Sequence, residues 1–514
     1  MANTDKKKVA KNTLFLYFRM ILIMLVSLYT SRVILAQLGI RDYGVYNVVG
    51  GVVSMFSFLN SSMASATQRF LTYSLGKGDF NRLRKTFATS MNIHILIALL
   101  IVLLSETIGL WFVNAKLVIP HDRMFAANVV YQFSILSFCV NIIQVPYDAV
   151  LIAHEKMSVY AYISILETVL KLVIVYMLSI SPFDKLITYS ILFFAVTLLI
   201  RFTYQIFCKR HYAESKFLLF WDKDLYKQMF SFAGWNLFGS LAWLCRNQGL
   251  SIILNLFFGP VVNAARGVAD QVSGAVMNFI SNFQTALNPQ ITKEYAVGQI
   301  EEMEKLTYLG IKFSYIIFFI LAFPLMLNIQ FVLGIWLVKV PDWTPIFVVL
   351  TLVDSLVGNM FGVPLMTSLS ATGNIRNYQI VVSSIILCIL PVGYLVLRLG
   401  AGPTSVFYIC IIFNFISGFA RFLFCRKQIG YSLNKLITKV ILPVLSMTAV
   451  ALPFPIYLRM KVFTDENWIN FIVLCFSAVL MVGITGWFIG MQSHERKVVV
   501  DMVKQKVHRR KQQS

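Results

Sequence analysis

The chain has 514 residues, of which 58% are hydrophobic and only 13% charged, and its formal net charge is +22. A soluble domain would carry about twice this charged fraction, so the composition excludes a soluble globular protein and indicates a polytopic membrane protein. Most basic residues lie in short loops between apolar runs and form no stripe with aromatic residues. Anionic lipid therefore explains the positive charge, and we expect no nucleic-acid partner.

Apolar stretches long enough to cross the membrane recur along the whole chain. A helix needs about 20 apolar residues to span the hydrocarbon core, and fourteen stretches meet this requirement. They are 13–38, 44–70, 87–113, 124–147, 158–180, 185–208, 230–257, 262–290, 306–330, 344–369, 376–398, 404–425, 436–458 and 467–491. The sequence therefore predicts an all-α membrane protein with 14 transmembrane helices.

Basic residues alternate from loop to loop in the way that sets membrane orientation. With residues 1–12 in the cytoplasm, the inside segments hold roughly 28 basic residues and the outside loops roughly 8. The basic tail at 492–514 then also lies in the cytoplasm. The sequence therefore predicts that both ends of the chain are cytoplasmic.

The first half of the sequence recurs about 220 residues later. Residues 39–85 align with 259–305, and both 145–157 and 363–375 begin with Val-Pro inside an apolar run. An even number of spans in each copy gives the two copies the same orientation, which makes them parallel repeats. The predicted organisation is an N-lobe of helices 1–6 (13–208), a cytoplasmic linker (209–229), a C-lobe of helices 7–12 (230–425) and helices 13 and 14 (426–491).

Several ionisable side chains lie inside predicted spans, where each costs at least about 2.5–3.5 kcal/mol. Glu167 and Lys171 are four residues apart and can neutralise each other. Arg32, Glu106 and Arg421 lie near helix ends and can reach the interface. The remaining candidates are Arg19, Asp148, Arg201, Arg246, Arg266, Asp270 and Asp354.

Two predicted helices carry polar stripes with a period near 3.6 residues. The stripe on the second helix consists of Ser54, Ser57, Ser61, Ser65, Gln68 and Thr72, and that on the eighth of Arg266, Asp270, Gly274, Ser281, Thr285 and Asn288. Small residues also allow close helix packing. The amides and the charges on the same faces instead favour a water-filled cavity.

We predict that this cavity is lined by Arg19, Gln68, Arg246, Arg266, Asp270 and Asn288. Arg246 lies near the middle of its helix, and Arg19 shares a face with Thr30. Arg266 and Asp270 are four residues apart, so they either line the cavity or form a private salt bridge. An excess of arginine predicts an anionic substrate, because guanidinium groups bind phosphate in a bidentate way.

The chain as a whole resembles the Wzx-type oligosaccharide flippases. The resemblance rests on the fourteen spans, the segment LGIRDYGVYNVV at 38–49, and the polar run SSMASATQRF at 61–70 followed by a short basic loop. These flippases share a superfamily with multidrug and toxic-compound extruders and with lipid II flippases. The resemblance implies two six-helix lobes around a cavity lined by helices 1, 2, 7 and 8.

The resemblance also implies a function. The substrate would be a polyprenyl-pyrophosphate-linked oligosaccharide, flipped across the inner membrane for O-antigen, capsule or exopolysaccharide synthesis. Arg19, Arg246 and Arg266 lie on the helices that carry pyrophosphate-binding arginines in similar proteins, and Asp270 would be the carboxylate to suspect in cation coupling. Membrane lipids, a glycan polymerase and glycosyltransferases would be partners.

Two other functions stay open. A cation-coupled multidrug extruder of the same superfamily would usually have twelve spans and a cavity that carries carboxylates. A membrane glycan polymerase or ligase would have a large outside loop, whereas the predicted outside loops are no longer than about a dozen residues. The sequence contains no HExxH, G-x-S-x-G or Walker motif, so we predict a protein that is not an enzyme and needs no cofactor or metal.

Overall fold

The computed structural model describes residues 2–496 except 55, 116, 118, 217–219, 338–339 and 494. The side chains of residues 2–11, of 260 and of some positions between 28 and 59 lie outside the described part. The described residues form helices and turns without a strand. Helices satisfy their own backbone hydrogen bonds, as an apolar bilayer requires. The prediction of an all-α polytopic membrane protein is confirmed.

The chain divides into two compact units, which are described separately. The N-terminal unit is Lys11–Leu237, and the C-terminal unit comprises Met1–Ala10 and Phe238–Ser514. The boundary at Leu237 falls inside the long helix α8 (Lys223–Ala296), so this helix contributes residues to both units.

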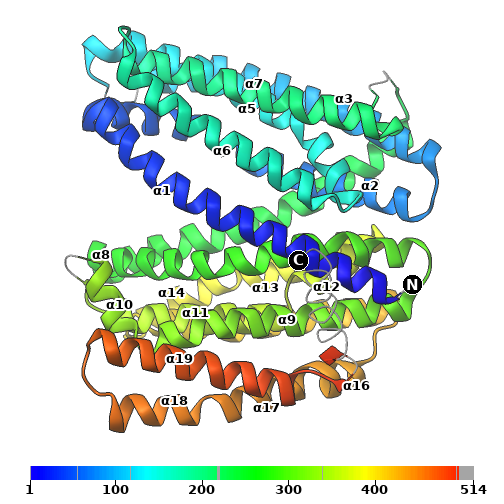
Figure 1. Ribbon diagram of the computed structural model, residues 1–514, viewed down its shortest axis with the longest axis vertical. Coiled ribbons are helices and arrows are strands. Elements are labelled where there is room, and N and C mark those ends of the chain that lie inside the picture. The colour runs from blue at the N-terminus through cyan, green and yellow to red at the C-terminus, as the bar shows by residue number, and fades with distance from the viewer. Residues whose placement is uncertain are drawn as a thin grey trace, which may run out of the picture. The chain divides into compact units, whose positions relative to one another are not determined.

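The N-terminal unit is a helical bundle in which α3, α5, α6 and α7 run beside one another (Figure 1). Its elements before α8 are α1 (Ala2–Ser54), α2 (Ser57–Gly76), α3 (Phe80–Leu104), η1 (Ser105–Gly109), α4 (Leu110–Ala115), η2 (His121–Arg123), α5 (Met124–Ala153), α6 (Met157–Ile180), α7 (Lys185–His211) and η3 (Ala213–Ser215). The side chains of Asp79 and Asp184 cap α3 and α7 by accepting hydrogen bonds from backbone amides of the first turn.

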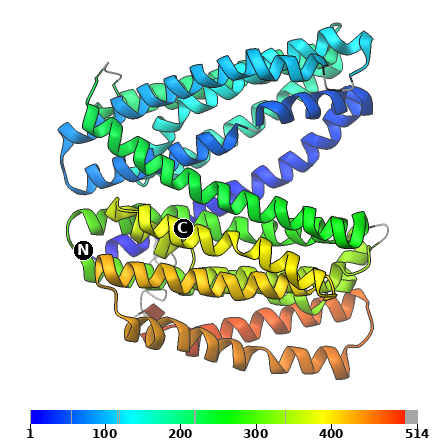
Figure 2. The same cartoon turned by 180° about the vertical axis from the view of Figure 1, so that it is seen from behind.

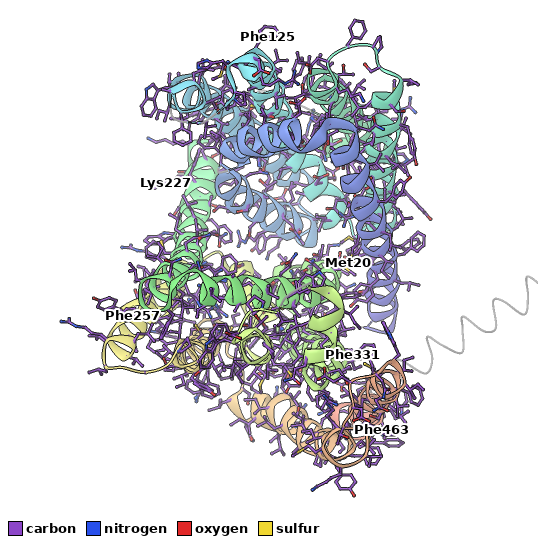
Figure 3. The ribbon with its side chains drawn as sticks, turned by 90° about the vertical axis from the view of Figure 1, so that its left-hand side faces the viewer. Met20, Phe125, Lys227, Phe257, Phe331 and Phe463 are labelled. Atoms are coloured by element: carbon purple, nitrogen blue, oxygen red, sulfur yellow. The ribbon has the colours of Figure 1, made fainter. Side chains whose placement is uncertain are left out.

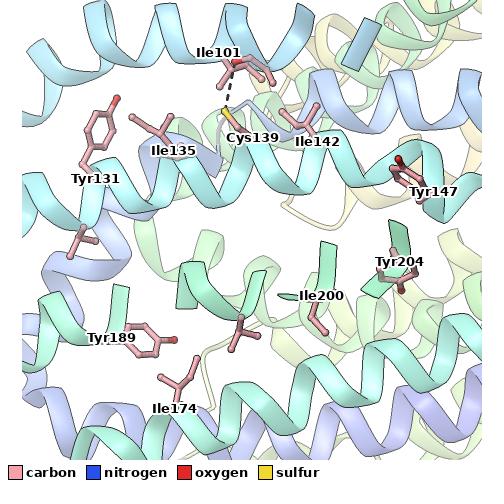
Figure 4. Packing of buried hydrophobic residues seen from close by; sticks show 14 of the residues in the cluster. Ile101, Tyr131, Ile135, Cys139, Ile142, Tyr147, Ile174, Tyr189, Ile200 and Tyr204 are labelled. Atoms are coloured by element: carbon pink, nitrogen blue, oxygen red, sulfur yellow. Dashed lines mark hydrogen bonds between the residues drawn. The ribbon is translucent and has the colours of Figure 1, made fainter. Parts of the chain in front are cut away.

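The core of this unit lies between α3, α5 and α7 (Figure 4). Ile135 and Ile142 of α5 are buried together with Ile200 of α7. The thiol of Cys139 donates a hydrogen bond to the carbonyl of Ala98 on α3, across 3.7 Å. Cys139 thus packs as a small apolar residue, as its position in an apolar run predicts.

The C-terminal unit continues with a second helical bundle, in which α13, α14 and α15 lie side by side (Figure 2). Its elements after α8 are α9 (Ile300–Leu327), α10 (Ile329–Trp336), α11 (Thr344–Met360), α12 (Val363–Thr372), α13 (Arg376–Leu387), α14 (Ile389–Arg398), α15 (Ser405–Ile429), α16 (Leu433–Leu436), η4 (Ile437–Ile441), α17 (Leu442–Ala451), α18 (Pro453–Tyr457), η5 (Leu458–Val462), α19 (Trp468–Thr485) and η6 (Gly486–Gly490).

Among the last helices, α16 to α19, both α17 and α19 pack against α9, and α19 also contacts α10. Phe331 of α10, labelled in Figure 3, lies 5.3 Å from the ring of Trp468 and 5.2 Å from that of Phe471, measured between ring centroids. These helices form the two predicted spans that follow the repeat.

Two pairs of glycines confirm the internal repeat in the backbone. Gly39 and Gly259 each interrupt a helix with a positive φ, of 76° and 78°, and the chain resumes a helix directly afterwards. Gly78 and Gly298 end the following helices with φ of 68° and 79°. Both pairs are separated by 220 residues, which is the offset found in the sequence.

The kink at Gly259 gives a testable stability prediction. Replacing Gly259 by Ala is expected to lower the free energy of unfolding by about 1 kcal/mol or more, because an L-residue is strained at positive φ. Gly274→Ala, at a helical position of α8 with open space around it, should instead stabilise the protein by up to about 1 kcal/mol. Unfolding in mixed micelles at increasing SDS measures both, and equal effects would contradict the role of the kink.

Ten described helical stretches are long and apolar enough to cross a membrane. The four predicted spans missing from this set are 13–38, 44–70, 230–257 and 262–290, which belong to α1, α2 and α8. These helices carry all six residues predicted to line the cavity. Within the first of these segments, the described stretch Asn12–Ser27 is apolar but shorter than a membrane span.

Arg123 joins three elements at the predicted outer end of the N-terminal unit. Its Nε and Nη2 donate to the two carboxylate oxygens of Asp42, at 2.8 and 2.5 Å, and its Nη1 donates to Asp184 at 2.5 Å. Asp42 lies just after the Gly39 kink, and Asp184 caps α7. A single guanidinium therefore holds the ends of α1, α5 and α7 together.

A buried ion pair attaches the end of the described chain to α9. The side chain of Lys312 is only 2% exposed, and its Nζ donates to Glu495 Oε2 at 2.5 Å and to the carbonyl of Gly490 at 3.5 Å. The same carboxylate oxygen accepts the backbone N–H of Gln492 at 2.8 Å. The segment after α19 is thereby fixed to the C-terminal unit.

Candidate functional site

Each unit holds its own cluster of charged side chains within the membrane-spanning helices. In the N-terminal unit, α1, α5, α6 and α7 enclose a polar cavity of about 360 Å³. Arg19 of α1, Asp148 of α5, and Glu167 and Lys171 of α6 line this cavity, together with Tyr204 of α7. The lining contains two cationic and two anionic groups, and Arg201 of α7 also acts on Asp148 from outside the lining.

The four charges of this cavity have different partners. Lys171 donates to Glu167 across one helical turn at 2.6 Å, which confirms that these two residues neutralise each other. The guanidinium of Arg19 lies 4.5 Å from the ring centroid of Tyr160. Asp148 accepts hydrogen bonds from the amide of Gln144 at 3.3 and 3.4 Å. Thr30 also lines the cavity, which agrees with the prediction that it shares a helix face with Arg19.

The second cluster lies in the C-terminal unit and is centred on Arg246 of α8. Arg246 is 8% exposed, and its Nη2 donates to Asp354 Oδ2 of α11 at 2.8 Å. The other carboxylate oxygen of Asp354 accepts the amide N–H of Asn414 on α15 at 2.5 Å. Asp354 is therefore saturated by two donors and neutralises Arg246, which explains how an arginine remains at this depth.

Arg266 and Asp270 lie on the next part of α8, within electrostatic range of this pair. Arg266 is 5% exposed and donates to the hydroxyl of Ser251 at 2.9 Å. Its Nε is 3.6 Å from Asp270 Oδ2, so the ion pair is long, and the side chain of Asp270 is 54% exposed. The charge that this cluster presents at its surface is thus a carboxylate.

The charge balance differs from the arginine excess inferred from the sequence. Asp354 lies beside Arg246, and Asp148 and Glu167 share the cavity of Arg19. Sequence analysis named these acids as ionisable residues within spans but did not place them with the arginines. No spacing in the sequence could do so, because Arg246 and Asp354 are 108 residues apart.

The polar stripe of α8 forms a continuous exposed face. Asp270, Gly274, Asn278 and Ser281 are all exposed, at helical spacing. Asn288 lies 22 residues after Arg266, about 33 Å further along the helix, and it accepts a hydrogen bond from Thr367 of α12 at 3.0 Å. Asn288 therefore lies outside the charged cluster and takes part in helix packing.

The stripe of the second predicted helix is described in part. The side chains of Ser54 and Ser57 lie outside the described residues, as does that of Arg32. Ser61 and Ser65 of α2 are exposed, Gln68 is half-buried and Thr72 is buried. The structure thus groups Arg246, Arg266 and Asp270, whereas Arg19 and Gln68 belong to the other unit.

The comparisons with known proteins point to one group of transporters. Residues 16–177 match the family model MatE. No curated protein matches the sequence. Among solved structures, an outward-facing multidrug resistance MATE family transporter of the MOP superfamily superposes with a TM-score of 0.70 at 14% identity, covering 83% of this chain and 96% of that one.

Two further structures give a similar result. A MATE protein in the bent conformation superposes with a TM-score of 0.68 at 14% identity, over 84% of this chain and 97% of that one. A MOP superfamily transporter from Pyrococcus furiosus gives 0.67 at 12% identity over the same shares, and the reversed polarity of its binding pocket suggests a different function for it. These likenesses show that the chain has the fold of these transporters.

Proposed function

We propose that this protein is a secondary transporter that exports its substrate by alternating access, in the manner of MATE proteins. The match to the MatE model, the fold shared with MOP superfamily transporters and the parallel repeat support this proposal. The two copies give two similar bodies that can rock against each other around a substrate. An ion gradient would supply the energy, since the sequence contains no Walker motif.

The substrate class that the site favours is an amphiphilic organic cation. The observation that carries this choice is the exposed carboxylate of Asp270 on the polar face of α8, while Arg246 and Arg266 behind it are buried and held by partners of their own. A carboxylate at membrane depth attracts a cation that would otherwise lose its hydration. The structural neighbours include a multidrug resistance transporter, which agrees with this choice.

A lipid-linked oligosaccharide is the second candidate substrate. The solved neighbours match along 96% or more of their own length but cover only 83–84% of this chain, so about one-sixth of it has no counterpart in them. The helices α16 to α19 also follow the twelve repeated spans, as the resemblance to Wzx-type flippases implies. In this case Arg246 and Arg266 would have to exchange their internal partners for pyrophosphate.

Transport in proteoliposomes separates the two candidates. We expect an imposed proton or sodium gradient to drive ethidium transport, and Asp270→Asn to slow it at least about tenfold, a loss of about 1.4 kcal/mol. Glu301→Gln is the matched control, because it removes the same charge at an exposed position at the start of α9. Absence of ethidium transport, together with flipping of a labelled polyprenyl-pyrophosphate oligosaccharide, would replace the first candidate with the second.

A further inference from the structure

Two charged side chains that line the cavity of the N-terminal unit, one cation and one anion, form no ion pair among the described residues. Arg19 and Asp148 both line it, yet among the described residues neither comes within ion-pair distance of an opposite charge. The other two charges, Glu167 and Lys171, are paired with each other. One guanidinium and one carboxylate therefore remain available to a ligand in a space of about 360 Å³.

Three polar atoms at this cavity are buried without a hydrogen-bond partner. They are Nε of Arg19, Oγ1 of Thr30 and Oε1 of Gln144. Thr30 is only 9% exposed, and its hydroxyl does not bond back to its own helix as buried threonines usually do. Leaving such groups unpaired costs about 1–3 kcal/mol each. A ligand that offers both donors and acceptors would satisfy them.

The charges of the cavity select the kind of ligand. A simple anion at Arg19 would be repelled by Asp148 and Glu167, and a simple cation at Asp148 would be repelled by Arg19 and Lys171. Either would also add a net charge to a site of low dielectric, which is expensive. A zwitterion adds no net charge, and it can place each end against the opposite charge of the protein.

We propose that this cavity binds a zwitterion that carries an ammonium group and a phosphate or carboxylate group. The ammonium lies at Asp148 and donates to Oε1 of Gln144, and the acidic group lies at Arg19 and accepts from Thr30. Tyr160 and Tyr204 line the same cavity. The cavity volume falls in the range of about 300–1,000 Å³ that is typical of small-ligand sites.

This chemistry occurs in free zwitterions and in the headgroup of ethanolamine phospholipids. Both sources present the same two charged ends, so the proposal names the chemistry and the experiment separates the sources. All of the residues involved lie in the N-terminal unit, and the inference does not depend on the transport function proposed above.

Calorimetric titration of the purified full-length protein tests the site with three probes. These are glycerophosphoethanolamine, whose phosphodiester carries a single negative charge and balances the ammonium, and its two halves, ethanolamine and dimethyl phosphate. We expect glycerophosphoethanolamine to bind at least about tenfold more tightly than either half. Equal or tighter binding of ethanolamine alone, or no binding of any probe at millimolar concentration, would overturn the proposal.

Variants of the two charged residues give opposite changes in selectivity. Arg19→Met should weaken glycerophosphoethanolamine binding at least about tenfold and make ethanolamine the preferred probe, because the repulsion between Arg19 and the ammonium is gone. Asp148→Asn should weaken glycerophosphoethanolamine binding by a similar factor and make dimethyl phosphate the preferred probe. A general loss of structure would lower the affinity for all three probes together, so it cannot produce this reversal.

Thr30→Val separates a binding role from a structural one. The substitution keeps the shape of the side chain and removes a hydroxyl that has no partner, so the melting temperature should stay unchanged or rise. The affinity for glycerophosphoethanolamine should nevertheless fall severalfold. Glu106→Gln, at an exposed position of η1, is the control that should leave both quantities unchanged. Unchanged affinity in Thr30→Val would contradict the assigned orientation.

Lipid nanodiscs identify the source of the ligand. The titration is repeated in phosphatidylglycerol alone and after addition of phosphatidylethanolamine or phosphatidylcholine. Loss of probe binding only with the ethanolamine lipid identifies a lipid headgroup, because the quaternary ammonium of choline cannot donate a hydrogen bond. Binding that survives both additions identifies a free zwitterion, and either result supports the site.

Discussion

Replacing Arg246 by alanine is expected to lower the free energy of unfolding by about 3–5 kcal/mol, because it leaves the largely buried carboxylate of Asp354 without its ionic partner. In the native protein both carboxylate oxygens of Asp354 have donors, one from Arg246 and one from Asn414. SDS unfolding in mixed micelles measures the loss. The same variant should also reduce export, since the cluster that holds Asp270 in place is disturbed.

A double variant distinguishes the ion pair from other roles of Arg246. Arg246→Met combined with Asp354→Leu removes both charges and keeps most of the volume, so its stability should return to within about 1 kcal/mol of the wild type. Arg426→Ala, at an exposed position near the end of α15, is the matched control for loss of an arginine. If the double variant were as unstable as Arg246→Ala, the loss would come from packing of the arginine stem rather than from the unpaired aspartate.

Arg123→Met is the second substitution for which we expect a large effect, a loss of about 2–4 kcal/mol. It leaves Asp42 and Asp184 close together without the guanidinium that bridges them, so repulsion adds to the lost hydrogen bonds. Arg123→Lys should recover only part of the stability, because an ammonium cannot match the bidentate contact with Asp42. Full recovery of stability with lysine would show that a positive charge between Asp42 and Asp184 is sufficient and that the bidentate geometry is not needed.

The contribution of Asp184 makes this clamp sensitive to acid. Burial would raise the pKa of Asp184, but hydrogen bonds from Arg123 and from the amides of Ile187 and Leu186 outweigh burial and hold the pKa below its ordinary value. The stabilisation is therefore present above the pKa of the unfolded chain and is lost as the pH falls through the lower folded value. In wild type the melting temperature should drop below about pH 4, whereas Arg123→Met should lose less over the same range. If the melting temperatures of the two proteins fell equally with pH, Arg123 would not be what stabilises the charged form of Asp184.

The fold could be predicted from sequence because the signals for it are local and repeated. Apolar length defines most spans, and the 220-residue offset corresponds to the kinks at Gly39 and Gly259. The segments of α1, α2 and α8 were predicted as spans from apolar length as well, and periodic polar residues marked α2 and the second part of α8 as candidates to line a cavity. The lobe boundaries at 208 and 230 stay predictions, and the compact units meet within α8 at Leu237.

The charged sites could be predicted only in part, because the partners of a buried charge come from distant helices. Helical spacing identified Arg266 with Asp270 and Glu167 with Lys171, since both pairs lie on one helix. The partner of Arg246 is on α11, and Arg19 faces an acid on α5. Counting arginines within spans therefore overestimated the positive charge of the site. The chemistry assigned to it changes from an anion site to an exposed carboxylate.

The ion pair between Lys312 and Glu495 has a consequence for how the protein is made. The two residues are 183 positions apart, so a ribosome that adds about 5–20 residues per second needs roughly 10–40 s to supply the partner after α9 has emerged. During that interval Lys312 is an uncompensated cation in a helix destined for the bilayer. The C-terminal unit therefore completes this contact only when the end of the chain arrives.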